Sequence, residues 1–226
     1  QQEAARKFGM SAKQSMVIAQ QLYEGINICE EGSTGLITYM RTDSITLSEL
    51  ALNQAAEVIK SRFGKEYYPG APRKFNIKSK NAQEAHEAIR PADLMRHPDD
   101  LKQYLDRGQQ KIYDIIWKRT IASQMTEAIF DSTAVDIAAK GLSNKDYNFR
   151  ANGQVIKFEG FIKAYSEGQD EDEEKEVEGQ LPELEKGEQL KLVELKPNQH
   201  FTEPPGRYSD ATLIKALESH GIGRPS

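Results

Sequence analysis

Residues 35–44 read GLITYMRTDS, a short apolar run that ends in a tyrosine, with an arginine two residues later and a Thr-Asp-Ser turn after it. We expect the apolar run to form a strand, on which residues i and i+2 project to the same face. Tyr39 and Arg41 are therefore predicted to stand side by side, with Asp43 next in the row. Two interpretations remain open: Tyr39 is a core aromatic of a strand, or it is a nucleophile with an arginine beside it.

The nucleophile interpretation follows from phosphate chemistry. A phenol has an ordinary pKa of about 10, so it is a weak nucleophile near neutral pH. A neighbouring guanidinium favours the phenolate and can fork onto the non-bridging oxygens of a phosphodiester, where it offsets the charge that develops as the ester bond breaks. Asp43 would orient Arg41 in this interpretation. Alternatively, Asp43 or Ser44 only caps the turn or the following helix.

The chain on either side of this stretch has mainly helical patterns. The first 26 residues are predicted to form two helices, the second capped by Ser11 and ended by Gly25, and a β-hairpin with a Gly-rich tip follows. Further helices are predicted over 47–62 and 108–125, and residues 64–80 are expected to be a basic loop.

A second group of polar residues lies in AQEAHEAIRP, residues 82–91. We expect HEAIRP to form a short helical turn limited by Pro91, which would place His86 and Arg90 on one helix face. Together these side chains would hold a phosphate, and the histidine would also move a proton. The alternative is a surface histidine beside ion pairs. A metal site is not expected, because no second histidine or other ligand cluster lies close in sequence.

The hydrophobic period changes after residue 128. STAVDIAA alternates as a strand does, NFRANGQVIKFEGFI is predicted to be two strands around an Asn152-Gly153 turn, and EQLKLVELK, residues 188–196, is predicted to be a further strand. Residues 167–178 hold eight acids and one lysine, and we expect a flexible acidic loop or linker there. The last element, SDATLIKALESHG, is predicted to be a helix with Ser209 as its cap.

The C-terminal stretch, TEPPGRYSDATLIKALESHGIGRPS, offers a third candidate phosphate site. Arg207 precedes the capped helix, whose N-terminus presents free backbone N–H groups to an anion. Arg224 follows the helix after a Gly-Ile-Gly turn. The alternative is an ordinary capped helix.

Charge and composition narrow the class of protein. The chain has 226 residues, of which 30 are basic and 35 are acidic. Residues 167–178 hold one of the basic residues and eight of the acidic ones. The rest of the chain therefore has 29 basic and 27 acidic residues, a net charge of +2. Residues 60–80 carry seven basic side chains and one acid, which suits an anionic partner. No apolar run is long enough to span a membrane, and a single cysteine, Cys29, favours a reducing, cytosolic location.

Three long motifs in fixed order carry a family resemblance. ITYMRTDS, then AQEAHEAIRP, then TEPPGRYSDATLIKALESHGIGRPS resemble the central part of bacterial DNA topoisomerase I, a type IA topoisomerase family, and the lead-in QQEAARKFGMSAKQSMVIAQQLYEG is similar to the same family. The resemblance covers nearly the whole chain; the acidic stretch and residues 64–80 are its least characteristic parts.

The resemblance implies a specific chemistry. Tyr39 would attack a DNA backbone phosphate, become joined to the 5′ end of one broken strand and leave a free 3′ hydroxyl, which reverses the reaction after the other strand has passed. No ATP would be needed. Arg41 would steady the scissile phosphate, and His86 would help to bind and position DNA. The candidates for further contacts to single-stranded DNA in the C-terminal motif are Arg207, Ser209, Thr212 and Arg224. Arg90 remains a DNA-binding candidate from its spacing to His86.

The resemblance also implies an α+β multidomain fold. Residues 1–128 would form a mainly helical, winged-helix-like domain that carries the tyrosine. Residues 129–195 would form a β-rich arch segment, and residues 196–226 the start of a helical DNA-binding domain. We expect this chain to be an interior piece of a longer one.

The sequence departs from the family in lacking the toprim domain, which holds the acidic Mg²⁺ triad. We therefore expect Mg²⁺ to be bound by that absent domain, no cofactor in this fragment, and no DNA relaxation by the fragment alone. The expected partners are single-stranded DNA and the toprim domain of the same chain, in the bacterial nucleoid of the cytoplasm, with no membrane. The alternatives are a DNA-binding module without chemistry, which would use residues 60–80, and an interaction module in which Tyr39 only packs.

Overall fold

The structure, a computed structural model, describes residues 1–28, 32–75, 86–141, 143–166, 168, 181–182 and 184–222. The chain divides into two compact units. The first takes in Gln1–Ala128 and the segments that begin at Glu159 and Tyr208, and the second takes in Ile129–Phe158 and the segment that ends at Arg207. None of the helices in the described ranges has the length and apolar character needed to cross a membrane.

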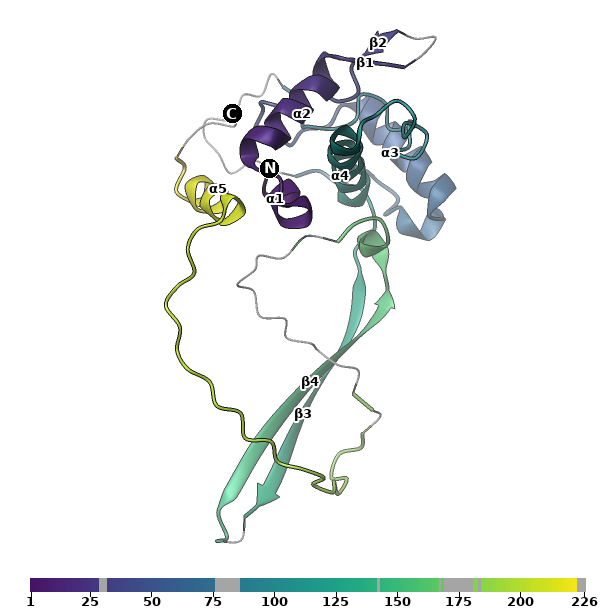
Figure 1. Cartoon of the computed structure of the whole chain (residues 1–226). Helices are drawn as coiled ribbons and strands as arrows, with labels where there is room; N and C mark the ends of the chain where they lie inside the picture. The colour runs from purple at the N-terminus through teal and green to yellow at the C-terminus, as the bar shows by residue number, and fades with distance from the viewer. Residues whose placement is uncertain are drawn as a thin grey trace. The chain divides into compact units, whose positions relative to one another are not determined.

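Helices dominate the first unit, in which α2 and α4 pack together and α1 contacts both (Figure 1). Their bounds are α1 Gln2–Phe8, α2 Ala12–Glu24, α3 Glu49–Arg62, α4 Arg107–Ser123 and α5 Asp210–Ser219. Ser11, Ser48, Asp106 and Ser209 cap the N-termini of α2, α3, α4 and α5 with their side chains. These caps satisfy backbone N–H groups that have no partner within the helix, and the predicted helices are confirmed to within a few residues.

The core of this unit lies where α2, α3 and α4 meet the loop that follows Pro91. Leu22, Ile59 and Trp117 are buried there, together with Leu94 of the loop. The indole N–H of Trp117 donates to the Leu94 carbonyl oxygen at 2.9 Å, so this large side chain is buried with its polar group satisfied. The helices are therefore joined to the loop segment by both apolar packing and hydrogen bonds.

A buried carboxylate fastens α1 to the chain that returns after residue 158. Glu3 is only 4% exposed; it accepts hydrogen bonds from the hydroxyl of Tyr165 and, at 3.1 Å, from the backbone N–H of Gly168. Burial by itself raises the pKa of Glu3, but these hydrogen bonds and the charge of Arg119 outweigh it and hold the pKa below its usual value of 4.5. The carboxylate is thus stable as an anion inside the fold.

The predicted hairpin before residue 35 is present as two short antiparallel strands, β1 Ile26–Asn27 and β2 Ser33–Thr34. Two 3₁₀ helices, η2 Lys65–Tyr67 and η3 Gly160–Lys163, complete the first unit. The described residues do not include Cys29, residues 76–85 or Arg224. Residues 76–85 hold part of the basic stretch and the four residues of the AQEAHEAIRP motif that precede His86.

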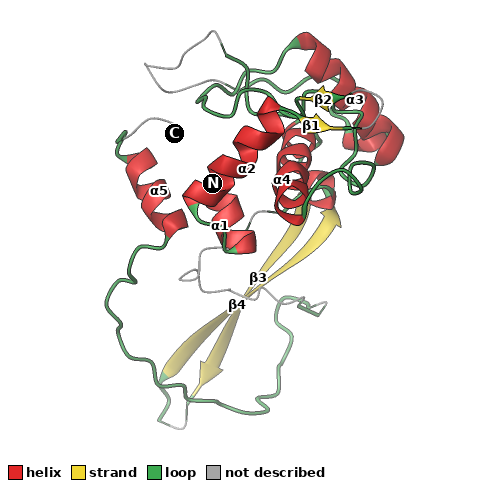
Figure 2. Ribbon diagram, turned by 45° about the horizontal axis from the view of Figure 1, so that its top comes forward, coloured by secondary structure: helices red, strands yellow, loops and turns green. Residues whose placement is uncertain are grey.

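The second unit is built around a long two-stranded antiparallel ribbon, β3 Ile129–Lys140 and β4 Asp146–Phe158 (Figures 1 and 2). The predicted turn at Asn152-Gly153 is wrong: Asn152 pairs with Ala134 and Gly153 with Thr133 in the middle of the ribbon. The chain reverses instead near Gly141, whose N–H donates to the Lys145 carbonyl oxygen at 2.9 Å. A turn at residue 152 would forfeit the continuous ladder with β3, which outweighs the local preference of Asn-Gly.

The strand predicted over residues 188–196 is also absent. These residues have no regular structure, and Leu192 and Val193 are 76% and 93% exposed. A strand requires a neighbour for its backbone hydrogen bonds, and among the described residues this segment pairs with none. The fold is therefore mixed α and β, as predicted in outline. The first unit ends at Ala128, and residues 159–166 and 208–222 belong with its helices.

Candidate active site

The loop that carries Tyr39 is held by backbone hydrogen bonds on both sides of the tyrosine. The N–H of Leu36 donates to the Leu22 carbonyl oxygen at 2.7 Å, and the N–H of Thr38 donates to the Arg90 carbonyl oxygen at 2.9 Å. Ile37 forms an isolated antiparallel bridge with Pro91. The loop is therefore joined to the end of α2 and to the segment around residue 90, which the sequence places far away.

The strand predicted over this stretch is wrong, because only Ile37 takes part in a bridge and the chain bends at residues 38, 40 and 41. The predicted alternation survives nevertheless. Met40, Thr42 and Ser44 are buried, whereas Tyr39, Arg41 and Asp43 are exposed. Buried hydroxyls hold the turn: Thr42 accepts from the Ser44 N–H, and Ser44 accepts from the Thr46 N–H. Tyr39 and Arg41 thus lie on the solvent side of one pinned loop.

Two aromatic rings flank Tyr39. The centroid of the Tyr23 ring lies 5.5 Å away and that of the His86 ring 5.4 Å away, both in edge-to-face geometry. Such contacts are favourable because the edge of one ring meets the electron-rich face of another. Tyr39 itself is 37% exposed. The ring is held in place on its sides while part of the side chain remains open to solvent.

His86 has a polar atom that nothing in the described structure satisfies. Its Nδ1 is buried and lacks a hydrogen-bond partner within the described ranges. Buried polar atoms without partners are uncommon in folded proteins and mark sites of strain or function. His86 therefore stands beside Tyr39 with hydrogen-bonding capacity still available.

The predicted helical turn at HEAIRP is wrong, and with it the shared face of His86 and Arg90. Residues 86–90 have no helical hydrogen bonds; the Ala88 N–H donates to the Thr46 carbonyl oxygen instead. The segment pairs with the Tyr39 loop, which a local helix would not allow. Tertiary pairing here replaces the local preference of the sequence.

Arg90 is part of the fold. It is 8% exposed, and its guanidinium donates to Glu87 at 2.9 Å and to the carbonyl oxygens of Pro91 and Ala92 at 2.7 and 3.1 Å, with a weaker contact to Ser48 at 3.4 Å. Burial raises the pKa of Glu87, but the Ser48 hydrogen bond and the charge of Arg90 outweigh it, so the pKa lies below its usual value. The prediction that Arg90 holds a DNA phosphate is corrected on this ground: its donors are already occupied.

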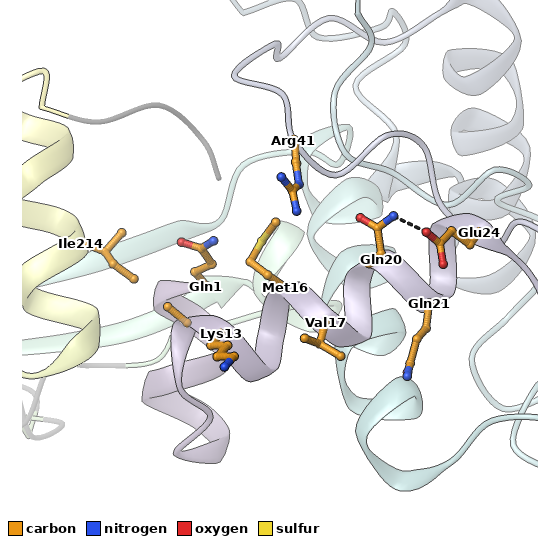
Figure 3. Close-up of a pocket in the computed structure, with 10 residues that line it drawn as sticks. Gln1, Lys13, Met16, Val17, Gln20, Gln21, Glu24, Arg41 and Ile214 are labelled. Carbon is orange, nitrogen blue, oxygen red and sulfur yellow. Dashed lines mark hydrogen bonds between the residues drawn. The ribbon is translucent and has the colours of Figure 1, made fainter.

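Arg41 is in the opposite situation. It is exposed, and among the described residues it makes no ion pair with Asp43 or with any other acid. Figure 3 shows its guanidinium directed toward Met16 and Gln20 of α2, at the edge of a groove along that helix. Asp43 does not cap the next helix either, because Ser48 does so. Arg41 is thus a free cation close in sequence to the exposed tyrosine.

The C-terminal candidates differ in what they contact. Ser209 and Thr212 form a reciprocal capping box at the start of α5, with the Ser209 N–H donating to Thr212 Oγ1 at 2.8 Å. Arg207 belongs to the second unit and is exposed. Contacts of Arg207, Ser209 and Thr212 with DNA stay predictions, as does that of Arg224, which the structure does not describe.

The described part of the basic stretch is largely committed to contacts within the chain. Lys60 lies over the ring of Tyr68, and Arg73 donates to the Met125 carbonyl oxygen at 3.0 Å while pairing with Glu127. Within the described ranges, no three His, Cys, Asp or Glu side chains gather in a way that would hold a metal ion. The free cation nearest the tyrosine in sequence is therefore Arg41 rather than a residue of the basic stretch.

Sequence reasoning missed two residues. Tyr23 lies in the second predicted helix and was given no role, but it is 40% exposed and its ring contacts Tyr39. Its place in the last turn of α2, two residues before the Gly25 exit, was the available signal. Lys13 drew no attention because it lies 26 residues before Tyr39, yet it lines the same groove as Arg41.

Comparison with known proteins gives consistent results. A family described as DNA topoisomerase matches residues 1–226. The chain is 53% identical over 226 residues to a protein named DNA topoisomerase 1 from Rickettsia bellii, and 48% identical over 228 residues to one of the same name from Xylella fastidiosa, strain Temecula1. All of this chain is covered in both cases, but only 28% of either relative.

A solved structure agrees with these matches. The structure titled full-length topoisomerase I from Thermotoga maritima superposes with a TM-score of 0.77 at 33% identity, and covers the whole of this chain and 34% of the Thermotoga chain. The similarity in structure thus extends over the same residues as the similarity in sequence. The chain spans under a third of the curated relatives that it matches.

Proposed function

Because the chain belongs to the DNA topoisomerase family, we propose that it carries the nucleophile of a type IA enzyme that cuts and rejoins one DNA strand to relax negative supercoils. The observation that supports this most directly is the setting of Tyr39. The side chain is partly exposed on a pinned loop, two rings hold it in position, and the unpaired Arg41 lies on the same exposed side.

The proposed reaction is a transesterification. The phenol oxygen of Tyr39 attacks a backbone phosphorus, the bond from phosphorus to the 3′ oxygen breaks, the phenol loses its proton and the 3′ oxygen gains one. The product is a 5′-phosphotyrosine and a free 3′ hydroxyl. One phosphate ester replaces another, so the reverse attack by the 3′ hydroxyl needs no ATP.

We assign Arg41 to the non-bridging oxygens of the attacked phosphate. A guanidinium without a carboxylate partner keeps its donors available for these oxygens and stabilises the charge that develops on them. Arg41 is not tied to Asp43 and is free to make this contact. Its contribution is expected in the transition state more than in the ground state.

We assign His86 to positioning the tyrosine and binding DNA. Its ring supports the Tyr39 ring at 5.4 Å, and its Nδ1 is buried without a partner among the described residues, so a DNA contact through this atom requires the site to open. The ring of Tyr23 also contacts the Tyr39 ring, in the same edge-to-face geometry. Together these contacts would restrict the direction from which the phenol oxygen meets the phosphate.

The proposal extends to the longer protein. We propose that Mg²⁺ is bound by a toprim domain outside this chain; the described residues offer no fitting cluster, and no step above runs through the ion. Residues 129–195 would be an arch segment and residues 196–226 the start of a helical DNA-binding domain, with Arg207, Ser209, Thr212 and Arg224 facing single-stranded DNA. The proposed location is the bacterial nucleoid in the cytoplasm.

The test is a covalent-adduct assay. The chain is combined with the toprim domain, Mg²⁺ and end-labelled single-stranded DNA, and the mixture is then denatured to trap any DNA joined to protein. We expect a labelled adduct with the native chain and none with Tyr39→Phe, which keeps the ring contacts but removes the attacking oxygen. An adduct that persists in Tyr39→Phe would refute the assignment. DNA binding without any adduct would favour a DNA-binding module, and no binding at all an interaction module.

A further inference from the structure

The loop between Pro91 and α4 is held to that helix by side-chain donors that reach its backbone. Three of its carbonyl oxygens accept hydrogen bonds from α4: that of Leu94 from the Trp117 indole at 2.9 Å, that of Arg96 from the Tyr113 hydroxyl at 2.8 Å and that of Pro98 from the Gln110 amide at 2.8 Å. His97 lies between two of these points in the sequence. The conformation of the loop therefore depends on a few contacts around a side chain that titrates near neutral pH.

The imidazole of His97 packs against a buried aromatic ring. Its centroid lies 4.7 Å from that of Trp117, and the two rings meet edge to face at 79°. Trp117 is 2% exposed, and the His97 side chain is 21% exposed. Most of the imidazole is thus withdrawn from water, which disfavours its charged form.

One hydrogen bond requires His97 to be neutral. The backbone N–H of Asp99 donates to Nδ1 of His97 at 3.2 Å. A ring nitrogen that accepts a hydrogen bond carries no hydrogen, so the proton of the neutral ring is on Nε2. In the imidazolium both nitrogens are donors. Protonation of His97 therefore breaks this bond and leaves the Asp99 N–H without its acceptor.

A second partner for the same nitrogen lies within reach. Nδ1 of His97 is 3.4 Å from the Asp99 carboxylate, which pairs with Lys102 at 2.7 Å. A protonated Nδ1 would turn from the N–H of Asp99 to its carboxylate and compete with Lys102 there. His97 and Asp99 thus have two possible arrangements, and the proton on Nδ1 selects between them.

The charges around His97 favour the neutral form. Besides Asp99 and Lys102, the charged side chains on the surrounding elements are Arg62 of α3, Asp100 of the loop, and Asp114 and Lys118 of α4. Burial, followed by the charge of Arg62, lowers the pKa of His97 below its usual value of 6.5, although the nearby acids oppose this shift. The unfolded chain therefore binds the proton more readily. The stability that neutral His97 contributes is complete above pH about 6.5 and declines as the pH falls through the folded pKa.

We propose that His97 is a proton-operated switch of this loop. At neutral pH the imidazole accepts from the Asp99 N–H and rests against Trp117. When protonated, it donates to the Asp99 carboxylate, displaces Lys102 and moves away from the indole, which loosens the loop from α4. The inference goes beyond the proposed function and does not depend on it, because none of these residues takes part in the proposed reaction.

The experiment uses Trp117, the only tryptophan of the chain, as its reporter. The fluorescence of the 226-residue chain is followed from about pH 8 to about pH 5, the interval in which histidine titrates. We expect one transition, with its midpoint below the usual histidine pKa of 6.5, as the contact of the indole changes. His97→Gln should remove the transition, since glutamine can still accept from the Asp99 N–H but does not titrate. The matched control is His220→Gln at the exposed end of α5, which should keep it.

Two exposed variants test the exchange of partners. Asp99→Asn keeps the backbone N–H but removes the carboxylate that receives the imidazolium, so the midpoint should fall. Lys102→Ala leaves that carboxylate free for the imidazolium, so the midpoint should rise. Each shift is expected to be about half a pH unit, the size of an exposed ion pair. Lys118→Ala, whose lysine pairs with Asp114, should shift the midpoint less than Lys102→Ala does.

These measurements also show how the proposal would fail. A flat fluorescence curve for the native chain, or a transition that persists in His97→Gln, would overturn the switch. Shifts of one sign in Asp99→Asn and Lys102→Ala would overturn the exchange of partners, because a histidine that only packs on Trp117 has no reason to respond to them in opposite directions. Urea unfolding at about pH 8, where histidine is neutral, controls for folding. There the Asp99 and Lys102 variants should unfold at the same urea concentration as the native chain.

Discussion

Arg41 lies on the Tyr39 loop and Arg90 lies on the segment that pairs with this loop, yet the fold uses the two arginines in opposite ways. Arg41 is exposed and has no acidic partner among the described residues, whereas Arg90 is buried and donates to Glu87 and to two backbone carbonyl groups. Both arginines follow the pattern expected of a phosphate ligand. The contrast shows that one motif arginine can hold a loop in place through buried hydrogen bonds while another stays exposed.

The largest effect is expected from Arg90→Ala. Removing this buried cation leaves two carbonyl oxygens without a donor and the carboxylate of Glu87 with only its Ser48 hydrogen bonds. Breaking a fully buried pair costs about 3–5 kcal/mol, and Glu87 is partly exposed, so we expect a loss of about 2–4 kcal/mol. Arg41→Ala, at an exposed site, should change the unfolding free energy by no more than about 0.5 kcal/mol. Urea unfolding of both variants measures the difference. Equal losses would end the distinction between the two arginines.

For the rate of adduct formation, the effect of changing Arg41 is expected to be large. Arg41→Ala is expected to slow adduct formation by about 100-fold, since removing one donor to a developing oxyanion costs on that scale, while DNA affinity falls much less. Single-turnover cleavage and equilibrium binding give the two numbers. Arg41→Lys is the conservative control and should recover part of the rate. Equal losses of rate and affinity would assign Arg41 to ground-state binding.

A smaller effect is expected from Ser48→Ala. Ser48 accepts from the Ala51 N–H as the cap of α3 and also contacts Arg90. Loss of a cap costs about 1 kcal/mol. In a double-mutant cycle with Arg90→Ala, the coupling between the two sites should be measurable, whereas a cycle with Arg41→Ala should be additive. Additivity in both cycles would show that the Ser48–Arg90 contact contributes nothing.

The smallest effect is the dependence of stability on pH through Glu87. Its pKa is lower in the folded chain than the usual 4.5, so the unfolded state binds the proton more readily. The stability that Glu87 contributes is complete above pH about 5 and declines as the pH falls through the folded pKa. Glu87→Gln should therefore flatten the acid limb of the unfolding free energy measured against pH. If Glu87→Gln leaves the unfolding free energy at acid pH unchanged, the Arg90–Glu87 pair does not contribute to stability in solution.

Local signals in the sequence predicted the helices well. The caps Ser11 and Ser209 act within a few residues, and the structure follows them. The predictions that failed depended on distant partners. Asn152-Gly153 is a good turn in isolation, but pairing with residues 133–134 keeps it straight. HEAIRP is a plausible helical turn, but it pairs with the Tyr39 loop instead.

The candidate site was predictable to a similar degree. The spacing placed Tyr39 and Arg41 on one face and left the role of the tyrosine open, and their roles in catalysis, which the family resemblance implies, stay predictions. The alternation of burial that the spacing implied is present even though no strand forms. The commitment of Arg90 could not be foreseen, because its carbonyl partners are backbone atoms that no side-chain pattern reveals. The contact of Tyr23 with Tyr39 depends on where α2 ends relative to the loop, which is a property of the tertiary structure.

The two ends of the β3–β4 ribbon leave and re-enter the first unit at one place, where the N–H of Phe161 donates to the Thr126 carbonyl oxygen at 2.9 Å. Gly160, with φ +50°, sits so close to Glu127 that an added Cβ would lie 2.4 Å from its backbone. Residues 126–127 and 160–161, on either side of the ribbon in sequence, thus contact each other within the helical unit. The ribbon is therefore an insertion in the chain of that unit. Its length can vary between homologues at little thermodynamic cost, because closing a longer excursion costs only logarithmically more, provided that position 160 stays glycine.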